Sequence, residues 1–123
     1  QAPRATWHGP WPSGWHVRHV DETGSTNADL LAAAAKGARH RTVLATDHQT
    51  AGRGRLDRRW EAPPGANLLV SILVREDLRD PHRWTQRVAL AARTACRLTA
   101  GVEPELKWPN DLLVGDRKLA GIL

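Results

Sequence analysis

The sequence has a single cysteine, Cys96, and no methionine, phenylalanine or tyrosine among its 123 residues. One cysteine cannot form an internal disulfide, which excludes disulfide-stapled secreted domains and predicts a reducing, cytoplasmic compartment. Cys96 falls within a predicted amphipathic helix, where a small apolar role is favoured over a nucleophilic one. No apolar run approaches the ~20 residues that cross a bilayer, and no signal peptide is visible at the start, so no membrane role is expected.

Lysine is also scarce, since only Lys36, Lys107 and Lys118 are lysines. Arginine therefore carries most of the positive charge behind the formal net charge of +5. This charge favours polyanionic or acidic partners and says nothing about the fold. The sequence contains no Walker motif, which excludes phosphate binding of the P-loop kind. A chain of this length forms one domain or part of one.

The most unusual composition lies in the segment Thr46–Trp60, and we call its part from Gly52 to Trp60 the basic loop. Glycine and arginine alternate at its start, two more arginines follow, and a tryptophan ends it. Glycine amides can turn toward an anion, and arginine offers paired donors to phosphate or carboxylate oxygens. Trp60 adds a flat ring for stacking. The loop alone does not distinguish a nucleotide, RNA or an acidic protein as the partner, and a solvated, flexible loop is the simpler alternative.

The first half of the chain reads as strand and then helix. Residues 15–22 alternate as a strand on which His16 and His19 face opposite sides, so this pair is not interpreted as a metal site. An alanine-rich helix begins near Thr26 and stops at Gly37. Its first amides are unsatisfied, and two interpretations stay open for the residues at its start: capping of the helix, or binding of a polar or anionic ligand.

Further elements follow along the chain. Residues 42–48 form a second predicted strand, and residues 67–74, apolar almost throughout, are expected to be central in the sheet. A second helix opens at Asp80-Pro81 and ends at Gly101. Its expected buried stripe repeats at steps of four and three: Trp84, Val88, Ala91, Ala95 and Leu98.

The two ends of the chain differ in character. Residues 1–14 contain several prolines and glycines without periodicity, which predicts a disordered or irregular arm. Residues 112–123 predict a hairpin around Gly115-Asp116. Since the chain stops inside the second predicted strand, we expect further sequence or a partner chain to complete the domain.

Four separated motifs together resemble the catalytic domain of biotin protein ligases, over residues 15–123. These motifs are Gly24-Ser25-Thr26-Asn27, Gln49-Thr50-Ala51-Gly52-Arg53-Gly54-Arg55 with Trp60, Lys107-Trp108-Pro109-Asn110-Asp111, and Lys118-Leu119-Ala120-Gly121-Ile122-Leu123. The resemblance implies the N-terminal part of an α+β domain like that of class II aminoacyl-tRNA synthetases, with a mixed β-sheet and flanking helices, here incomplete.

The resemblance also implies a two-step reaction. Biotin and ATP give biotinyl-5′-AMP and pyrophosphate, and a lysine of an acidic biotin carboxyl carrier domain is then acylated. Mg²⁺ accompanies ATP, and biotin is a substrate. We expect a monofunctional ligase without a DNA-binding role, because no helix-turn-helix precedes Trp15. The resemblance leaves open whether this chain acts alone.

Residue roles follow from the same motifs. For biotin they are Ser25, Thr26, Gln49, Gly52, Arg53, Lys118 and Gly121. For ATP they are Arg55, Trp60, Lys107 and Asn110. The catalytic set is Arg53, Arg55, Lys118 and Asp111, and Asp111 is the one candidate side chain for Mg²⁺. The cationic residues Arg53, Arg55 and Lys118 suit this reaction, because a carboxylate and a phosphate must come together and positive charge offsets their repulsion.

The sequence departs from the family at Asp57, where glycine is usual, and the carboxylate partly neutralises the basic loop. Two alternatives to the biotin ligase interpretation stand beside it. A lipoate ligase-like enzyme shares the fold and the adenylation chemistry but has different motifs. A small basic RNA-binding module would use the +5 charge, the Arg-Gly repeats and the tryptophans of the chain, but it explains none of the other motifs.

Overall fold

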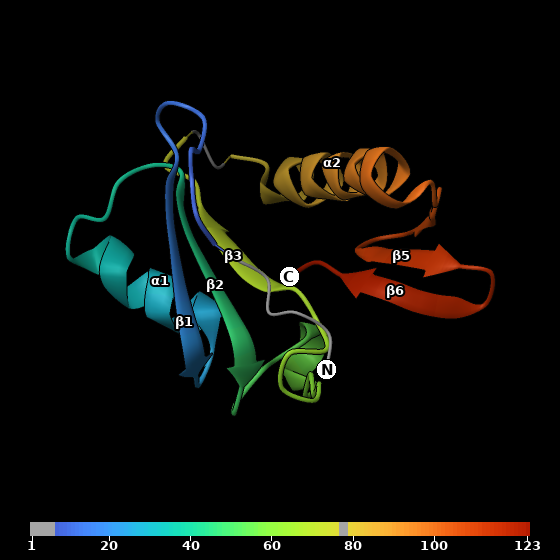
Figure 1. The fold of residues 1–123 in the computed structure, drawn as a ribbon, viewed down its shortest axis with the longest axis horizontal. Coiled ribbons are helices and arrows are strands. Elements are labelled where there is room, and N and C mark those ends of the chain that lie inside the picture. The colour runs from blue at the N-terminus through green and yellow to red at the C-terminus, as the bar shows by residue number, and fades with distance from the viewer. Residues whose placement is uncertain (1–6, 77–78) are drawn as a thin grey trace. The chain divides into compact units, whose positions relative to one another are not determined.

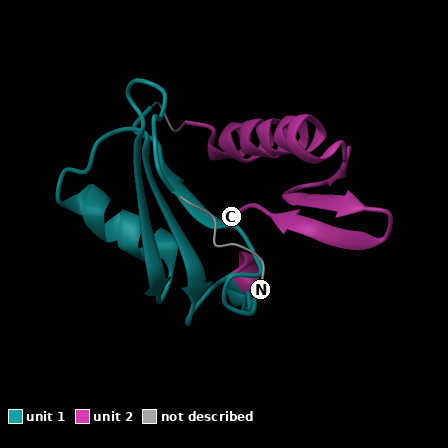
Figure 2. Ribbon diagram, in the orientation of Figure 1, with its two compact units in different colours: residues 1–53, 57–76 teal, residues 54–56, 77–123 magenta. Residues whose placement is uncertain are grey.

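The computed structural model describes residues 7–76 and 79–123, which fall into two compact units. Unit 1 comprises residues 1–53 and 57–76, and unit 2 comprises residues 54–56 and 77–123 (Figure 2). No helix in the described part of the chain is long and apolar enough to cross a membrane.

Unit 1 is built on a three-stranded sheet in the order β1-β2-β3 (Figure 1). The strands are β1 (His16–Thr23), β2 (Thr42–Gln49) and β3 (Leu69–Leu73). β1 and β2 run parallel, with His19 opposite Ala45, whereas β2 and β3 run antiparallel, with Leu44 opposite Ser71. The predicted mixed sheet is therefore confirmed.

Helix α1 (Thr26–Ala35) connects the two parallel strands and packs on the sheet. Its first turn is set by Ser25, an N-cap in extended conformation, and the chain leaves it through Gly37 at φ 91°. Leu30 is buried, as are Leu44 and Leu69 of the sheet. The start and end predicted for this helix are confirmed.

The prediction that residues 67–74 form a central strand is wrong. β3 lies at one end of the three-strand order, and β2 lies between its neighbours. Along β3, Leu69 and Ser71 are buried while Val70 and Ile72 are 40% and 42% exposed. The apolar run of β3 thus reflects burial of one face. Among the strands of the described residues, only β2 has consecutive buried residues, so only β2 is buried on both faces.

Unit 2 consists of helix α2 (Pro81–Ala100) and an antiparallel sheet of β4 (Glu105–Lys107), β5 (Asp111–Val114) and β6 (Arg117–Gly121). α2 packs against β5, the middle strand of the order β4-β5-β6. Pro81 begins the helix, and Gly101 ends it at φ 65°, as predicted. The hairpin is also confirmed, while β4 extends it by a strand that the sequence pattern did not predict.

The buried stripe predicted for α2 is wrong in its second half. Ala89 is the buried residue of the helix, Ala92 and Cys96 are half-buried, and Leu98 is 76% exposed. Trp84 is half-buried, with the Arg87 guanidinium 5.0 Å from its ring centroid. Small residues on several sides of the helix permit more than one stripe at this spacing, and contact with β5 selects the one through Ala89.

The N-terminal segment has no helix or strand between residues 7 and 14, and residues 1–6 of the predicted arm lie outside the described residues. Trp7 nevertheless stacks on His19 of β1, with ring centroids 5.4 Å apart. At the other end, β6 stops at Gly121, and the Ile122 amide donates to the Asn110 carbonyl at 2.8 Å.

Leu112 offers a test of the unit 2 core, because it is 0% exposed between α2 and its sheet neighbours. Leu112→Ala should lower the free energy of unfolding by about 2–5 kcal/mol, through lost apolar burial and the cavity left behind. Urea denaturation measures the change. The matched control is Leu119→Ala, since Leu119 is 48% exposed on the adjacent strand. Equal losses in the two variants would contradict this account of the core.

Candidate functional site

A buried polar cluster lies where α1 begins, and it joins residues far apart in the sequence. Thr26 is 3% exposed. Its backbone amide donates to Gln49 Oε1 at 2.8 Å, and its hydroxyl lies 3.0 Å from the same oxygen. The helix start and the end of β2 are thereby tied together. Two residues predicted from the family motifs, Thr26 and Gln49, are in direct contact.

Two residues outside the predicted set complete this cluster. Ser71 of β3 is 8% exposed, and its hydroxyl lies 2.7 Å from the Thr26 hydroxyl. Ser71 also bonds the Asn27 side chain. The sequence signal for Ser71 is only a lone hydroxyl inside an apolar strand. Asn27 belongs to a family motif, but the motif did not predict a separate role for it.

Ser25 adopts the capping role, with its hydroxyl accepting from the Ala28 amide at 3.3 Å. It is half-buried and adjacent to Thr26 in sequence. Capping satisfies one of the exposed helix amides, and the helix start retains partial positive charge. The capping interpretation is confirmed for Ser25, and a contact with a ligand stays a prediction.

Gly52 lies against this cluster at a point that excludes a side chain. A Cβ at this position would come within 2.5 Å of the Trp60 carbonyl oxygen and 2.9 Å of Gln49 Nε2. Gly52 is buried, and its carbonyl accepts from the Trp60 amide at 2.9 Å. Glycine is therefore required by close approach of the loop backbone to the Gln49 amide. This contact also places Gln49 Nε2 next to the entrance of the basic loop.

The basic loop closes on itself. Arg53 and Arg59 form an isolated antiparallel bridge, and Arg55–Asp57 form the short 3-10 turn η1. The arginine side chains are exposed, and Arg59 lies 3.9 Å from Glu61. Leu56 and Asp57 both have φ 57°, in the left-handed region. Asp57 thus occupies the backbone conformation that explains a preference for glycine at this position.

A second group of predicted residues lies in unit 2. Lys118 Nζ is 3.0 Å from Asp111 Oδ1, with the two side chains 43% and 20% exposed. In the sheet, Asp111 is opposite Lys107 on β4 and opposite Gly121 on β6. Asn110 Nδ2 donates to the Ile122 carbonyl at 2.9 Å. Three predicted residues, Lys107, Asp111 and Gly121, therefore fall along one row across the strands. Lys118 lies outside this row, opposite Leu113, and the Asn110 amide binds the backbone just after β6.

Unit 2 also contains an open cavity of about 400 Å³. Two of the residues predicted for ATP, Arg55 and Asn110, line it. The first turns of α2 contribute His82 and Gln86, and Trp108 adds an aromatic ring that is 74% exposed. The cavity combines a guanidinium, amides and a flat ring, which suits a polar aromatic ligand.

The predicted residues thus form two sets, each within one unit. Unit 1 contains Ser25, Thr26, Gln49, Gly52, Arg53 and Trp60, and unit 2 contains Arg55, Lys107, Asn110, Asp111, Lys118 and Gly121. The first set surrounds the helix start and the loop entrance. The second follows the sheet and the cavity.

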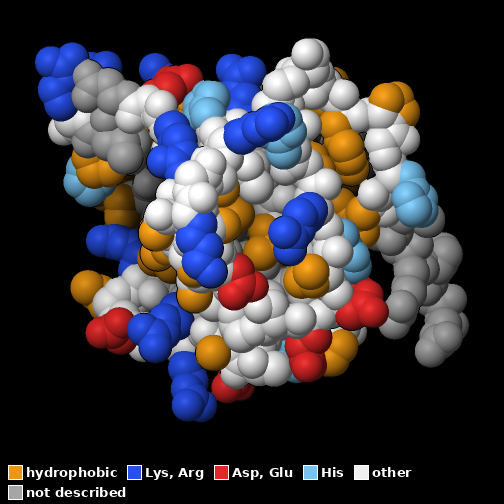
Figure 3. All heavy atoms as spheres, turned by 90° about the vertical axis from the view of Figure 1, so that its left-hand side faces the viewer, with side chains coloured by type: hydrophobic (Ala, Val, Ile, Leu, Met, Phe, Trp, Pro, Cys, Tyr) orange, Lys and Arg blue, Asp and Glu red, His pale blue; other side chains and the backbone are white. Residues whose placement is uncertain are grey.

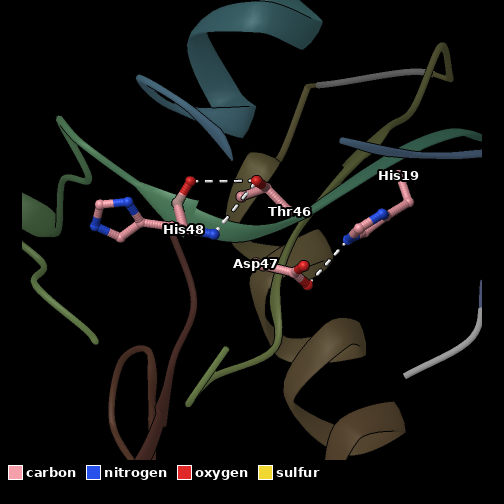
Figure 4. Close-up of polar contacts among 4 residues, drawn as sticks. All are labelled: His19, Thr46, Asp47 and His48. Carbon is pink, nitrogen blue, oxygen red and sulfur yellow. Dashed lines mark hydrogen bonds and ion pairs between the residues drawn. The ribbon is translucent and has the colours of Figure 1, made fainter. Parts of the chain in front are cut away.

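A different group has the residue types of a metal site. His19, Asp21 and Asp47 each offer one ligand atom, and these atoms lie within 4.8 Å of one another. His19 Nε2 is 3.0 Å from Asp47 Oδ1 (Figure 4), and this contact links β1 to β2. The 2.7 Å contact between His48 Nδ1 and Glu22 links the same strands. Both contacts therefore have a structural explanation in the pairing of the two strands.

The two histidines of β1 differ in exposure. His16 is exposed and His19 is half-buried. This difference agrees with the prediction that they face opposite sides of the strand.

Basic and acidic side chains are mixed on the face shown in Figure 3, where the blue lysine and arginine side chains lie scattered among red aspartate and glutamate. The positive charge on this face is not gathered into one continuous patch. A module that binds RNA mainly through its backbone phosphates would favour a continuous basic surface.

Asp57→Gly should raise the free energy of unfolding by up to about 1 kcal/mol, because glycine adopts positive φ without the clash of a Cβ. Urea denaturation of the variant and the wild type measures the difference. Asp116→Gly is the matched control, since Asp116 is also an exposed turn aspartate but has no positive φ. A loss of stability in Asp57→Gly equal to that in the control would contradict the backbone argument.

Comparisons with known proteins agree on one family. Residues 21–123 match the Biotin/lipoate A/B protein ligase family. A biotin--[acetyl-CoA-carboxylase] ligase of Mycobacterium tuberculosis is 44% identical over 119 residues, covering 90% of this chain and 45% of that protein. The bifunctional ligase/repressor BirA of Bacillus subtilis is 34% identical over 112 residues, covering 89% of this chain and 34% of that protein.

The fold leads to the same group. A biotin protein ligase from Aquifex aeolicus, solved in complex with biotin and ATP, superposes with a TM-score of 0.75 at 29% identity. The match covers 88% of this chain and 45% of that one. The chain spans less than half the length of these relatives. The family model nevertheless covers most of the sequence, and the chain belongs to the Biotin/lipoate A/B protein ligase family.

Proposed function

We propose that the chain provides the biotin- and ATP-binding part of an ATP-dependent biotin–protein ligase. The observation that carries this proposal is the arrangement at the start of α1, where Thr26 and Gln49 form a buried polar cluster against Gly52. Such a cluster suits an uncharged ligand head with both donors and acceptors, and the ureido ring of biotin is of that kind. The relatives named as biotin ligases support the assignment.

The reaction joins two anions, the biotin carboxylate and the α-phosphate of ATP, to give biotinyl-5′-AMP and pyrophosphate. Cations must offset their repulsion and stabilise the charge that develops on the phosphate oxygens. Arg53 and Arg55 supply planar guanidinium groups in the basic loop, and Lys118 supplies a compact ammonium. In this proposal Trp60 packs against adenine, and Lys107 and Asn110 contact ATP.

The side chains of Lys118 and Asp111 form an ion pair at 3.0 Å. An anionic ligand therefore competes with the Asp111 carboxylate for the Lys118 ammonium. An incoming carboxylate or phosphate replaces Asp111 as the partner of the ammonium. Asp111 is then released to polarise the amine of the incoming carrier lysine. Its role is thus assigned to the second step and that of Lys118 to the first.

Mg²⁺ is proposed to arrive with ATP. Mg²⁺ prefers six oxygen ligands and commonly takes most of them from phosphates and water, with one or two carboxylates from the protein. The candidate carboxylate, that of Asp111, is paired with Lys118, and the neighbouring Asn110 amide is bonded to the Ile122 carbonyl. These residues fit a magnesium ion bound mainly by ATP, which would neutralise phosphate charge.

The acceptor is proposed to be a lysine of a biotin carboxyl carrier domain, acidic enough to be attracted by the positive charge of the chain. Residues 15–123 are proposed as the N-terminal part of the catalytic domain, acting in the cytoplasm. The lipoate ligase-like alternative belongs to the same broad family, but the named relatives favour biotin.

Ligand stabilisation tests the proposal directly. Biotin with MgATP should raise the melting temperature of the 123-residue chain, because a ligand that binds only the folded state adds to its stability. Differential scanning fluorimetry measures the shift, with single-stranded RNA as the competing ligand. Stabilisation by RNA alone would favour the RNA-binding module over a ligase.

Loss of one cation should show its role in adenylation. In the complete catalytic domain, Lys118→Ala and Arg53→Ala are each expected to lower biotinyl-5′-AMP formation by about 10²-fold or more, because each removes a charge that acts on the transferred group. Pyrophosphate release measures the rate. Lys36→Ala is the control, since Lys36 lies at the exposed C-terminal end of α1. Wild-type rates in Lys118→Ala would refute its assignment.

A further inference from the structure

In the buried cluster at the start of α1, the Thr26 and Ser71 hydroxyls take part in three side-chain contacts but have only two protons to donate. Three side-chain contacts follow one another: Gln49 to Thr26, Thr26 to Ser71, and Ser71 to Asn27. Each hydroxyl has a single proton to donate. The direction of every bond in this series can therefore be worked out once one of them is fixed.

The fixed point is Gln49. Its side-chain atom facing α1 accepts from the Thr26 backbone amide at 2.8 Å, and a backbone N–H can only donate. That atom is thus the amide oxygen, and the Thr26 hydroxyl, 3.0 Å away, donates to it as well. The only hydroxyl proton of Thr26 is then used, so at the 2.7 Å contact with Ser71 the Thr26 oxygen must accept.

Ser71 consequently donates to Thr26 and has no proton left for Asn27. In the structure the Asn27 Oδ1 faces the Ser71 hydroxyl, so with this assignment two acceptors would meet without a proton between them. The nitrogen and oxygen of a side-chain amide occupy nearly equivalent positions, so a rotated amide satisfies the contact with its N–H. The hydrogen bonds then all have the same direction: Asn27 donates to Ser71, Ser71 donates to Thr26, and Thr26 donates to Gln49. We call this series of hydrogen bonds the relay.

We propose that Ser71 is a positioning residue for ligand specificity, because its hydroxyl fixes the direction of this relay. With the relay complete, the Gln49 oxygen is occupied by two donors, and its Nε2, which lies beside Gly52, is the donor that the amide offers a ligand. Asn27 turns its nitrogen inward and retains its carbonyl oxygen as an acceptor. The pattern suits a ligand that presents both a carbonyl and an N–H, as a cyclic urea does.

Burial makes this direction consequential. Thr26 and Ser71 are 3% and 8% exposed, so water does not readily replace a lost partner. A buried polar group without its hydrogen bond is strongly disfavoured. A ligand with the opposite donor and acceptor pattern would have to reverse several bonds at once, which is the physical basis of the specificity.

The relay can be observed without any ligand, by NMR of the 123-residue chain. Nuclear Overhauser contacts from the Asn27 side-chain NH₂ protons to the Ser71 β-protons are expected. Ser71→Thr keeps the hydroxyl and should retain the Asn27 NH₂ chemical shifts. Ser71→Val has nearly the shape of the threonine variant but no hydroxyl, and it should move these shifts toward those of a free amide. Unchanged Asn27 shifts in Ser71→Val would overturn the relay.

The specificity role rests on the proposed function and is tested separately by calorimetric titration with biotin. Ser71→Val should raise the biotin dissociation constant about tenfold, in keeping with the loss of one to two buried hydrogen bonds, and Ser71→Thr should stay within about twofold of the wild type. Equal affinity in the Thr and Val variants would overturn the role of Ser71. Failure of the wild type to bind biotin, with the NMR contacts present, would instead overturn the proposed function and with it the role in biotin specificity.

Discussion

The bond from the Thr26 amide to Gln49 Oε1 is the constraint on which unit 1 depends. It connects the first turn of α1 to the last residue of β2, so the helix start and the strand end cannot move independently. Gly52 then has to pass the Gln49 amide closely, which fixes where the basic loop leaves the sheet. One peptide N–H thereby links the helix, the sheet and the loop. A functional site at this junction inherits its geometry from the fold itself.

Charge is arranged differently in the two units. In unit 1 three arginines of the basic loop, Arg53, Arg58 and Arg59, are exposed, and the polar cluster of Thr26, Gln49 and Ser71 is neutral. In unit 2 the ammonium of Lys118 on β6 is paired with Asp111 on β5. Neutral recognition and cationic chemistry are thus carried by separate groups of residues.

Much of the fold could be predicted because local signals were strong. Ser25 and Gly37 bound α1, and Pro81 and Gly101 bound α2, through capping and backbone preferences that act within a few residues. The position of β3 could not be predicted in this way, since strand order depends on partners distant in sequence. The α2 stripe failed for a similar reason: alanines on several sides leave the choice of buried face to tertiary contact.

The candidate site shows the same division between local and distant information. Motif residues such as Thr26 and Gln49 were recognised from their neighbours in sequence, and the structure joins them. Ser71 had no motif around it, and only the pairing of β3 with β2 brings its hydroxyl to the helix. The glycine preference at Asp57 was recognised as a family pattern, but its cause, a backbone in the left-handed region, required φ angles.

The contact between Lys118 and Asp111 gives this chain its own internal counterion. Any anionic ligand must displace a tethered carboxylate before it gains the ammonium, so part of its intrinsic affinity is spent on an exchange. The ammonium is 43% exposed and the carboxylate 20%, so water screens this pair only in part. The ion pair also holds the Lys118 side chain in place before a ligand binds. Ligands with little negative charge gain little binding energy from an ammonium that is already paired.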